Sequence, residues 1–196
     1  MTDASARRLR VLTVIASSEF GGAERVLASV LKGHDPDRFQ VFVACHGEGP
    51  MADEYRQHAA GVWALPLTSI FSTKSVVALV RLMRRLRCEV VHSYLWTADV
   101  LTGLASTLAR VPIRVASVGG EYFRAVDERG MRRARKALLS HAHRLAYWPF
   151  DRVIAVSRRT AEDLMNRAGI RVDPRKVITI LNDIGERYFS TRLWGT

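Results

Sequence analysis

The residues best suited to bind a ligand are two adjacent glycines, Gly21 and Gly22, which stand between an apolar segment and a helical pattern. Residues 9–16 are apolar and rich in β-branched side chains, which is typical of a strand buried on both faces of a parallel sheet. Apolar residues then recur at helical spacing, at Val26, Leu27, Val30 and Leu31. Glycines at such a junction leave no Cβ to obstruct a ligand. Because a helix N-terminus carries about half a positive elementary charge, this loop is expected to favour phosphate or carboxylate.

Two widespread nucleotide-binding loops are absent from the sequence. The fingerprint Gly-x-Gly-x-x-Gly does not occur, and the second expected strand ends at Cys45-His46 rather than at an acidic residue that would hold a ribose. No Gly-x-x-x-x-Gly-Lys-Ser/Thr loop occurs either. The sequence therefore disfavours a nicotinamide cofactor and a nucleoside triphosphatase. The Gly-Gly pair itself is equally compatible with an anion site and with a plain tight connection.

Apolar segments and amphipathic helical patterns alternate along the chain, which predicts a sheet covered by helices on both faces. We expect strands at residues 8–16, 39–45, 62–65, 89–92, 113–118, 152–156 and 177–181. Helices are expected at residues 22–32, 51–59, 74–87, 96–109, 128–146 and 158–168, the last of them capped by Ser157. The predicted fold class is α/β, with a Rossmann-like, doubly wound and mainly parallel sheet of about seven strands. A chain of 196 residues is long enough for one such domain.

Three motifs carry a resemblance to a known family: Gly21-Gly22-Ala23-Glu24-Arg25, Glu89-Val90-Val91-His92-Ser93 and Asp151-Arg152-Val153-Ile154-Ala155-Val156-Ser157. In this order and at these distances they resemble the N-terminal half of a family-four, GT-B-type glycosyltransferase, over about residues 8–181. The resemblance implies two Rossmann-like domains that face each other across a cleft. It also implies an enzyme that moves a sugar from a nucleotide-activated donor to an acceptor, with retention at the anomeric carbon.

The resemblance implies roles for individual residues as well. The N-terminal domain would mainly hold the acceptor, while Gly21 and Gly22 would face the donor diphosphate, where fixed backbone dipoles stabilise the charge of the leaving group. His92 is expected at the carboxyl end of its strand, where it either lines the acceptor pocket or is a half-buried histidine bonded to a neighbouring loop. Similar enzymes often end the next strand with a histidine. This chain instead offers, as further candidates for the acceptor pocket, Gly119, Gly120 and Glu121.

The last residues depart from the family pattern. Similar enzymes continue through an Asn-Gly-Ile-Asp linker into a donor-binding domain, whereas this sequence reads Leu181-Asn182-Asp183-Ile184 and stops at Thr196. We therefore assign residues 1–181 to the N-terminal domain and 182–196 to a truncated linker or tail. This polypeptide alone is expected to bind acceptor or phosphate weakly and to transfer nothing. The donor half would be a missing C-terminal domain or a separate subunit, and a non-catalytic binding module is the alternative.

The chain is strongly basic, with 30 Lys and Arg against 19 Asp and Glu. Two expected helices hold much of the excess, at Arg81, Arg84, Arg85, Arg129, Arg132, Arg133 and Lys136. On the second of these helices the spacing i, i+3, i+4 and i+7 forms one stripe, which would fit an anionic membrane surface carrying a lipid-linked acceptor. A solvated helix face is the plain alternative. Nucleic acid would satisfy the same charge but is not expected as a partner, because no recognition motif or stacking pattern accompanies it.

Neither a membrane span nor a metal site is expected. No stretch approaches about 18 consecutive apolar residues, and residues 1–10 lack the apolar core of a signal peptide. We therefore expect a cytoplasmic protein, peripheral at most at the inner face of the membrane. Cys45 and Cys88 form no metal-like or redox-like pair and are expected to be reduced core thiols. No cofactor is expected beyond the nucleotide-sugar substrate.

Overall fold

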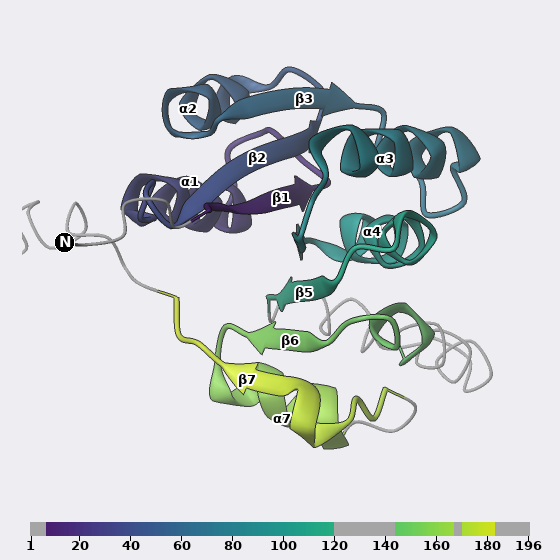
Figure 1. Ribbon diagram of the computed structural model, residues 1–196. Helices are drawn as coiled ribbons and strands as arrows, with labels where there is room; N and C mark the ends of the chain where they lie inside the picture. Colours follow the sequence, from purple (N-terminus) through teal and green to yellow (C-terminus); the bar gives the residue numbers. More distant parts are fainter. Residues whose placement is uncertain (1–6, 120–143, 167–169, 183–196) are drawn as a thin grey trace, which may run out of the picture.

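A computed structural model describes residues 7–119, 144–166 and 170–182, and these residues form one parallel sheet with helices on its faces (Figure 1). The seven strands follow the order β3-β2-β1-β4-β5-β6-β7. Their bounds are β1 Leu9–Ile15, β2 Phe39–His46, β3 Gly61–Leu65, β4 Val90–Tyr94, β5 Ile113–Val118, β6 Arg152–Ala155 and β7 Val177–Thr179. Because β1 pairs with β2 on one side and with β4 on the other, the winding direction reverses there, and open α/β sheets bind ligands at such a point.

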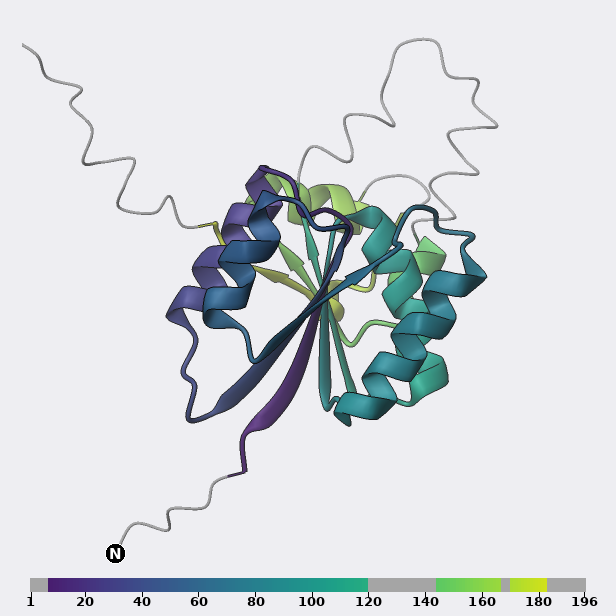
Figure 2. The ribbon, with the colours of Figure 1, turned by 90° about the horizontal axis from the view of Figure 1, so that it is seen from above.

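The helices divide between the two faces of the sheet. They are α1 Gly22–Gly33, α2 Pro50–His58, α3 Thr73–Leu86, α4 Trp96–Ala109 and α7 Arg158–Asn166, with a short 3-10 helix at Pro174–Lys176. Figure 2 shows α1 and α2 on one side of the sheet and α3 and α4 on the other. Crossovers between parallel strands are right-handed, so the helices change face where the winding direction changes.

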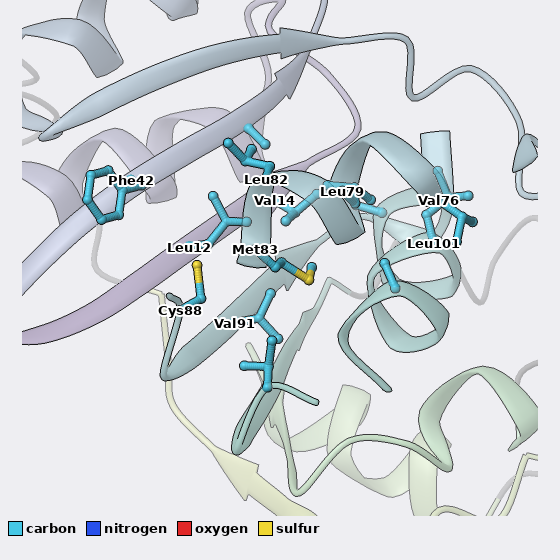
Figure 3. Close-up of a cluster of buried hydrophobic side chains, with 14 of the residues drawn as sticks. Leu12, Val14, Phe42, Val76, Leu79, Leu82, Met83, Cys88, Val91 and Leu101 are labelled. Atoms are coloured by element: carbon cyan, nitrogen blue, oxygen red, sulfur yellow. The ribbon is translucent and has the colours of Figure 1, made fainter. Parts of the chain in front are cut away.

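The core consists of three clusters of apolar side chains. Under α3 and α4, the sheet residues Leu12, Val14 and Val91 pack against Leu79 and Leu101 (Figure 3). The opposite face under α1 and α2 holds a second cluster, which contains Ile15, Val43, Leu27, Leu31 and Tyr55. The third cluster joins β5 and β6 to α7, and it contains Ala116, Val153, Phe150 and Leu164.

One face of the last three strands lies outside these clusters. Val115, Ile154 and Ile178 point away from the α4 side, and none of them belongs to the three clusters. Ile178 is 42% exposed. Among the residues that the structure describes, these three side chains form a partly bare strip of this face, which Ser117 and Arg152 interrupt.

The predicted architecture is confirmed, with differences at element ends. All seven expected strands are present and parallel, and the expected helix at residues 128–146 falls mostly outside the described residues. The predicted cap is present, since the backbone N–H of Thr160 donates to Ser157 Oγ at 3.1 Å. Both cysteines are free and buried, as expected. Strand β4 runs to Tyr94 rather than to His92, and β7 ends at Thr179, two residues early.

Candidate functional site

The glycine loop exposes the N-terminus of α1. Gly21 is the N-cap residue in an extended conformation, and no side chain caps the helix at this residue. Gly22 is the first helical residue, is exposed, and has no atom within 4 Å of the position that a Cβ would occupy. Gly22 therefore carries one of the N–H groups that a helix N-terminus leaves without an intrahelical partner, on an exposed residue with no side chain.

Glu24 restricts the direction from which an anion can approach. It lies in the first turn of α1, is buried, and turns its carboxylate back so that a Cβ on Gly21 would collide with it. A carboxylate in this position interacts favourably with the helix dipole. It also places negative charge beside Gly21, so the open side of the loop is the Gly22 side.

A pocket of about 290 Å³ lies between the loops that follow β1 and β2. Residues 16–19 and 46–49 line it. Both loops leave the carboxyl ends of adjacent parallel strands, so the pocket stands at the sheet edge where ligands bind in this class of fold. The loop that follows β1 contributes residues 16–19 to the pocket and then leads into the N-terminus of α1 at Gly21.

Ser18 ties the two loops together. Its side-chain Oγ donates to the carbonyl of His46 at 2.6 Å and accepts from the backbone N–H of Gly49 at 2.8 Å, while its carbonyl accepts from Met51 at 3.0 Å. A Cβ on Gly49 would lie 2.7 Å from both the Ser18 carbonyl carbon and Oγ, so this close approach requires glycine. Gly47 has a φ of +71°, a conformation that glycine adopts without strain.

The chemistry of the pocket is that of hydrogen bonding rather than of nucleophilic attack. Glu19 and Glu48 are exposed at its rim, and Glu48 forms an ion pair with Arg56. His46 Nδ1 contacts the carbonyl of Leu65 at 3.3 Å. Cys45 precedes this lining in β2 and is buried outside it, and burial raises the pKa of its thiol to about 11, which leaves it un-ionised near neutral pH. Carboxylates, imidazole and main-chain groups in one hollow can bind a polyhydroxylated molecule.

His92 lies inside β4 rather than at its carboxyl end. It pairs in register with Thr13 and Val115, and its Nε2 lies 2.8 Å from Ser117 Oγ. The imidazole also packs on the ring of Tyr94, with the ring centres 4.5 Å apart. Burial lowers the pKa of His92 to about 4, so it is neutral at physiological pH. Of the two expected roles, the geometry favours the bonded, partly buried histidine, although the bond goes to a neighbouring strand rather than to a loop.

The other predicted site residues are divided between the described and undescribed parts of the chain. Gly119 is exposed at the carboxyl end of β5, with no atom within 4 Å of the position that a Cβ would occupy. Arg81, Arg84 and Arg85 are exposed on α3, and Arg84 donates to the carbonyl of Leu108 at 2.8 Å. Six candidates lie outside the described residues, namely Gly120, Glu121, Arg129, Arg132, Arg133 and Lys136.

Sequence reasoning missed two features of this edge, namely the Ser18–Gly49 contact and the buried carboxylate Asp99 on α4. No local pattern marks the contact, because the two residues lie 31 positions apart in the chain. Asp99 did leave a signal, since it is the one charged residue in the otherwise neutral helix Trp96–Ala109.

Metal sites and membrane spans are both absent from the described parts of the chain. No group of three or more His, Cys, Asp or Glu side chains there could hold a metal ion. None of the helices described is long and apolar enough to span a membrane.

The fold and the loops at its carboxyl edge define a class of protein. A seven-stranded parallel sheet of this kind matches one half of GT-B-type glycosyltransferases in solved structures. Anabaena Alr3699/HepE, solved in complex with UDP-glucose, superimposes with a TM-score of 0.71 at 19% identity, over 95% of this chain and 47% of that protein. MurG of Acinetobacter baumannii gives a TM-score of 0.59 at 11% identity, over 89% of this chain and 45% of that protein.

The sequence identifies the family within this class. Residues 20–184 match the model of Glycosyltransferase Family 4, and the chain belongs to this family. It is 22% identical over 188 residues to UDP-Gal:alpha-D-GlcNAc-diphosphoundecaprenol alpha-1,3-galactosyltransferase of Escherichia coli. That alignment covers 93% of this chain and 47% of the relative, so the chain spans about half the length of the proteins that it matches.

Proposed function

We propose that this chain is the acceptor-binding half of a retaining glycosyltransferase, which transfers a sugar from a nucleotide-sugar donor to a glycan or lipid-linked acceptor. The loop of Gly21 and Gly22 faces the donor diphosphate on its Gly22 side, away from the Glu24 carboxylate, and the pocket between the first two loops receives hydroxyl groups of the acceptor. The observation that carries the proposal is the exposed N-terminus of α1, which follows in the chain shortly after residues 16–19, which line a pocket at the carboxyl edge of the sheet. The donor is held mainly by a second half, and this half alone transfers no sugar.

The electrostatics of the loop support the role assigned to it. Departure of a nucleoside diphosphate develops negative charge, and a preorganised N–H donor stabilises that charge without reorganising. The Gly22 amide group is such a donor, and the lack of a Cβ lets a phosphate oxygen approach it. This contribution comes from the main chain itself.

The similar proteins support the substrate class. Solved structures of Alr3699/HepE contain UDP and UDP-glucose, and the name of the Escherichia coli relative specifies a UDP-galactose donor and a diphosphoundecaprenol-linked acceptor. We infer by analogy that this chain works with a UDP-sugar or a related nucleotide sugar. The pocket rim, with Glu19 and Glu48, suits neutral sugar hydroxyl groups better than a phosphate.

Two substitutions at Gly22 test the anion site. Gly22→Pro removes the amide N–H, and proline is well tolerated at the first position of a helix. Gly22→Ala keeps the N–H and adds a methyl group in open space, so it is the matched control. We expect the proline variant to bind UDP roughly tenfold more weakly, the loss typical of one charge-assisted hydrogen bond. The measurement is a titration of the ¹⁵N-labelled chain with UDP, followed by NMR shifts. Equal affinity of all three proteins would contradict the proposal.

Transfer itself is tested by adding the second half. The chain is supplied with a donor-binding half, in one polypeptide or as a separate subunit, and incubated with labelled UDP-sugars and lipid-linked acceptors. We expect product only in the combined preparation, with the anomeric configuration of the donor retained in its NMR spectrum. Inversion at the anomeric carbon would refute the retaining mechanism.

An anionic bilayer is a second partner that the surface favours. Arg81 and Arg85 are exposed on α3, and the neighbouring α4 exposes Leu104 and Leu108 by 52% and 51%. Basic and apolar side chains on adjoining helices suit the headgroup region of a membrane. We infer that this surface brings the pocket close to a lipid-linked acceptor.

A further inference from the structure

Asp99 is a buried carboxylate that joins two distant parts of the chain. It lies in the first turn of α4 and is 1% exposed. Its Oδ1 accepts a hydrogen bond from Ser93 Oγ of β4 at 2.6 Å, and its Oδ2 accepts one from the Tyr147 hydroxyl at 3.2 Å. Removing a buried hydrogen-bonding group from such a position exposes its partners to a desolvation penalty.

Tyr147 belongs to residues 144–150, which we call the return segment because they lead back to the sheet at β6. The segment approaches α4 closely at Gly103, where a Cβ would lie 3.2 Å from the Phe150 ring and 3.4 Å from the carbonyl oxygen of Ala146. The rings of Trp96 and Tyr147 meet edge to face, with centres 6.2 Å apart. Asp99 therefore sits within the contact between α4 and the return segment.

Among the described residues, no charged group offsets the carboxylate within this contact. Its hydrogen-bond donors are two neutral hydroxyl groups, and α4 carries no other charged residue. In the return segment Arg144 is exposed, while Arg114 and Lys176 donate to carbonyl groups of that segment, each at 3.0 Å. Burial raises the pKa of Asp99 to about 7, against the lowering effect of the two hydrogen bonds.

We propose that Asp99 is a proton-dependent joint, which holds the return segment on α4 when it is protonated and releases it when it is ionised. An ionised carboxylate in this contact keeps its two hydroxyl donors, but it has neither water nor a described cation beside it, so its charge is poorly solvated. Opening of the return segment admits water to Asp99, so ionisation favours the open state. This inference rests on the contacts of Asp99 alone and does not depend on the proposed transferase function.

The sign of the pH dependence follows from the two states. The closed state binds the proton more tightly than the open state, so raising the pH through neutrality increases the open fraction. With a closed-state pKa of about 7 and an ordinary value in the open state, the opening equilibrium increases roughly 10- to 100-fold between pH 5 and pH 8. The joint would thus loosen within the physiological range.

Hydrogen exchange of the full chain tests the joint. Opening of peptides covering residues 144–150 is measured from pH 5 to pH 8, with rates corrected for intrinsic exchange and referenced to β1. We expect the roughly 10- to 100-fold increase in the unmodified protein. Asp99→Asn keeps the side-chain size and is neutral throughout, so its opening should be independent of pH. Glu162→Gln, an exposed acid-to-amide change on α7, is the matched control and should keep the full pH dependence.

A direct titration keeps the proposal testable if the asparagine variant fails to fold. The ¹³C carboxyl signal of Asp99 in the unmodified chain should titrate near pH 7. A midpoint near pH 4, or opening of residues 144–150 that is independent of pH in the unmodified protein, would overturn the proposal.

Discussion

At the scale of single residues, Ser18 and Gly49 determine whether the pocket exists. The Ser18 side chain bridges the two loops, and its backbone leaves no room for a Cβ at Gly49. A substitution at either residue therefore acts on the distance between the loops. By contrast, Gly22 stands in open space on the same edge.

This contrast predicts opposite outcomes for two glycine-to-alanine changes. Gly49→Ala should destabilise the protein by about 1–3 kcal/mol, because backbone atoms of Ser18 must move to admit the methyl group. Gly22→Ala should leave the stability unchanged or raise it by up to about 1 kcal/mol. Urea unfolding of both variants measures the difference. Equal stabilities would show that the loops can separate without cost.

Only part of the candidate site could be predicted at this scale. Gly21 and Gly22 are recognisable because a strand, two glycines and a helix follow one another in the sequence, and local patterns carry that information. Ser18 and Gly49 meet only after β1 and β2 have paired, so nothing near either residue marks the contact. Asp99 was open to prediction, since a lone acid in an apolar helix requires a buried partner.

At the scale of elements, β4 contributes the titratable side chain of His92, and through Ser93 it contacts a second titratable group, Asp99 of α4. His92 faces one side of the strand and bonds Ser117, while Ser93 faces the other side and bonds Asp99. These partners also explain why β4 is longer than expected. A His-Ser pair looks like the end of a strand, but both side chains are satisfied inside the sheet, so the strand continues to Tyr94.

The two buried groups have opposite effects on stability. The folded-state pKa of Asp99 is raised to about 7, so its contribution is full at low pH and is lost as the pH rises towards and through 7. The folded-state pKa of His92 is lowered to about 4, so its contribution is full above pH 6.5 and is lost as the pH falls to 4. Between about pH 4 and pH 6.5, Asp99 therefore makes the free energy of unfolding fall with pH, while His92 makes it rise.

Single substitutions should reveal the effect of each residue on the pH dependence of the free energy of unfolding. Asp99→Asn should make the free energy of unfolding rise with pH between 4.5 and 6.5, by up to about 1.4 kcal/mol per pH unit relative to the unmodified protein. His92→Gln should make it fall over the same range. Urea unfolding at several pH values gives both differences, and the double variant is the control, which should return to the unmodified pH dependence. Parallel curves for all four proteins would contradict these assignments.

At the scale of the whole molecule, the basic surface of α3 should determine how strongly the protein binds an anionic membrane. Arg81→Glu with Arg85→Glu reverses two exposed charges on α3 and spares the bond from Arg84 to α4. Each basic residue contributes about 1 kcal/mol near an anionic bilayer, so binding to anionic vesicles should weaken at least tenfold. Flotation with anionic and with neutral vesicles measures the change.

The matched control reverses the same amount of charge elsewhere. Arg158→Glu with Arg159→Glu alters two exposed residues on α7 and should leave vesicle binding within about twofold of the unmodified protein, apart from long-range effects that salt screens. Equal losses in both variants would mean that net charge alone attracts the protein. Retention on duplex DNA at high salt would favour the nucleic-acid alternative instead.

The architecture was predictable because each element has its own pattern, and the family match covers residues 20–184. The sequence could not predict whether a helix covers the sheet face opposite α7, because strands with alternating apolar residues look the same in either case. Val115, Ile154 and Ile178 form that partly bare strip in the described part of the chain.

We expect this strip to promote self-association of the chain. Exposed isoleucine on an edge strand favours dimerisation and aggregation. Light scattering should therefore rise with protein concentration, and a dye such as ANS should fluoresce when it binds the native protein. Ile178→Lys should quench both signals without unfolding the domain. The Ile178→Lys variant should therefore stay in solution at higher concentrations than the unmodified polypeptide.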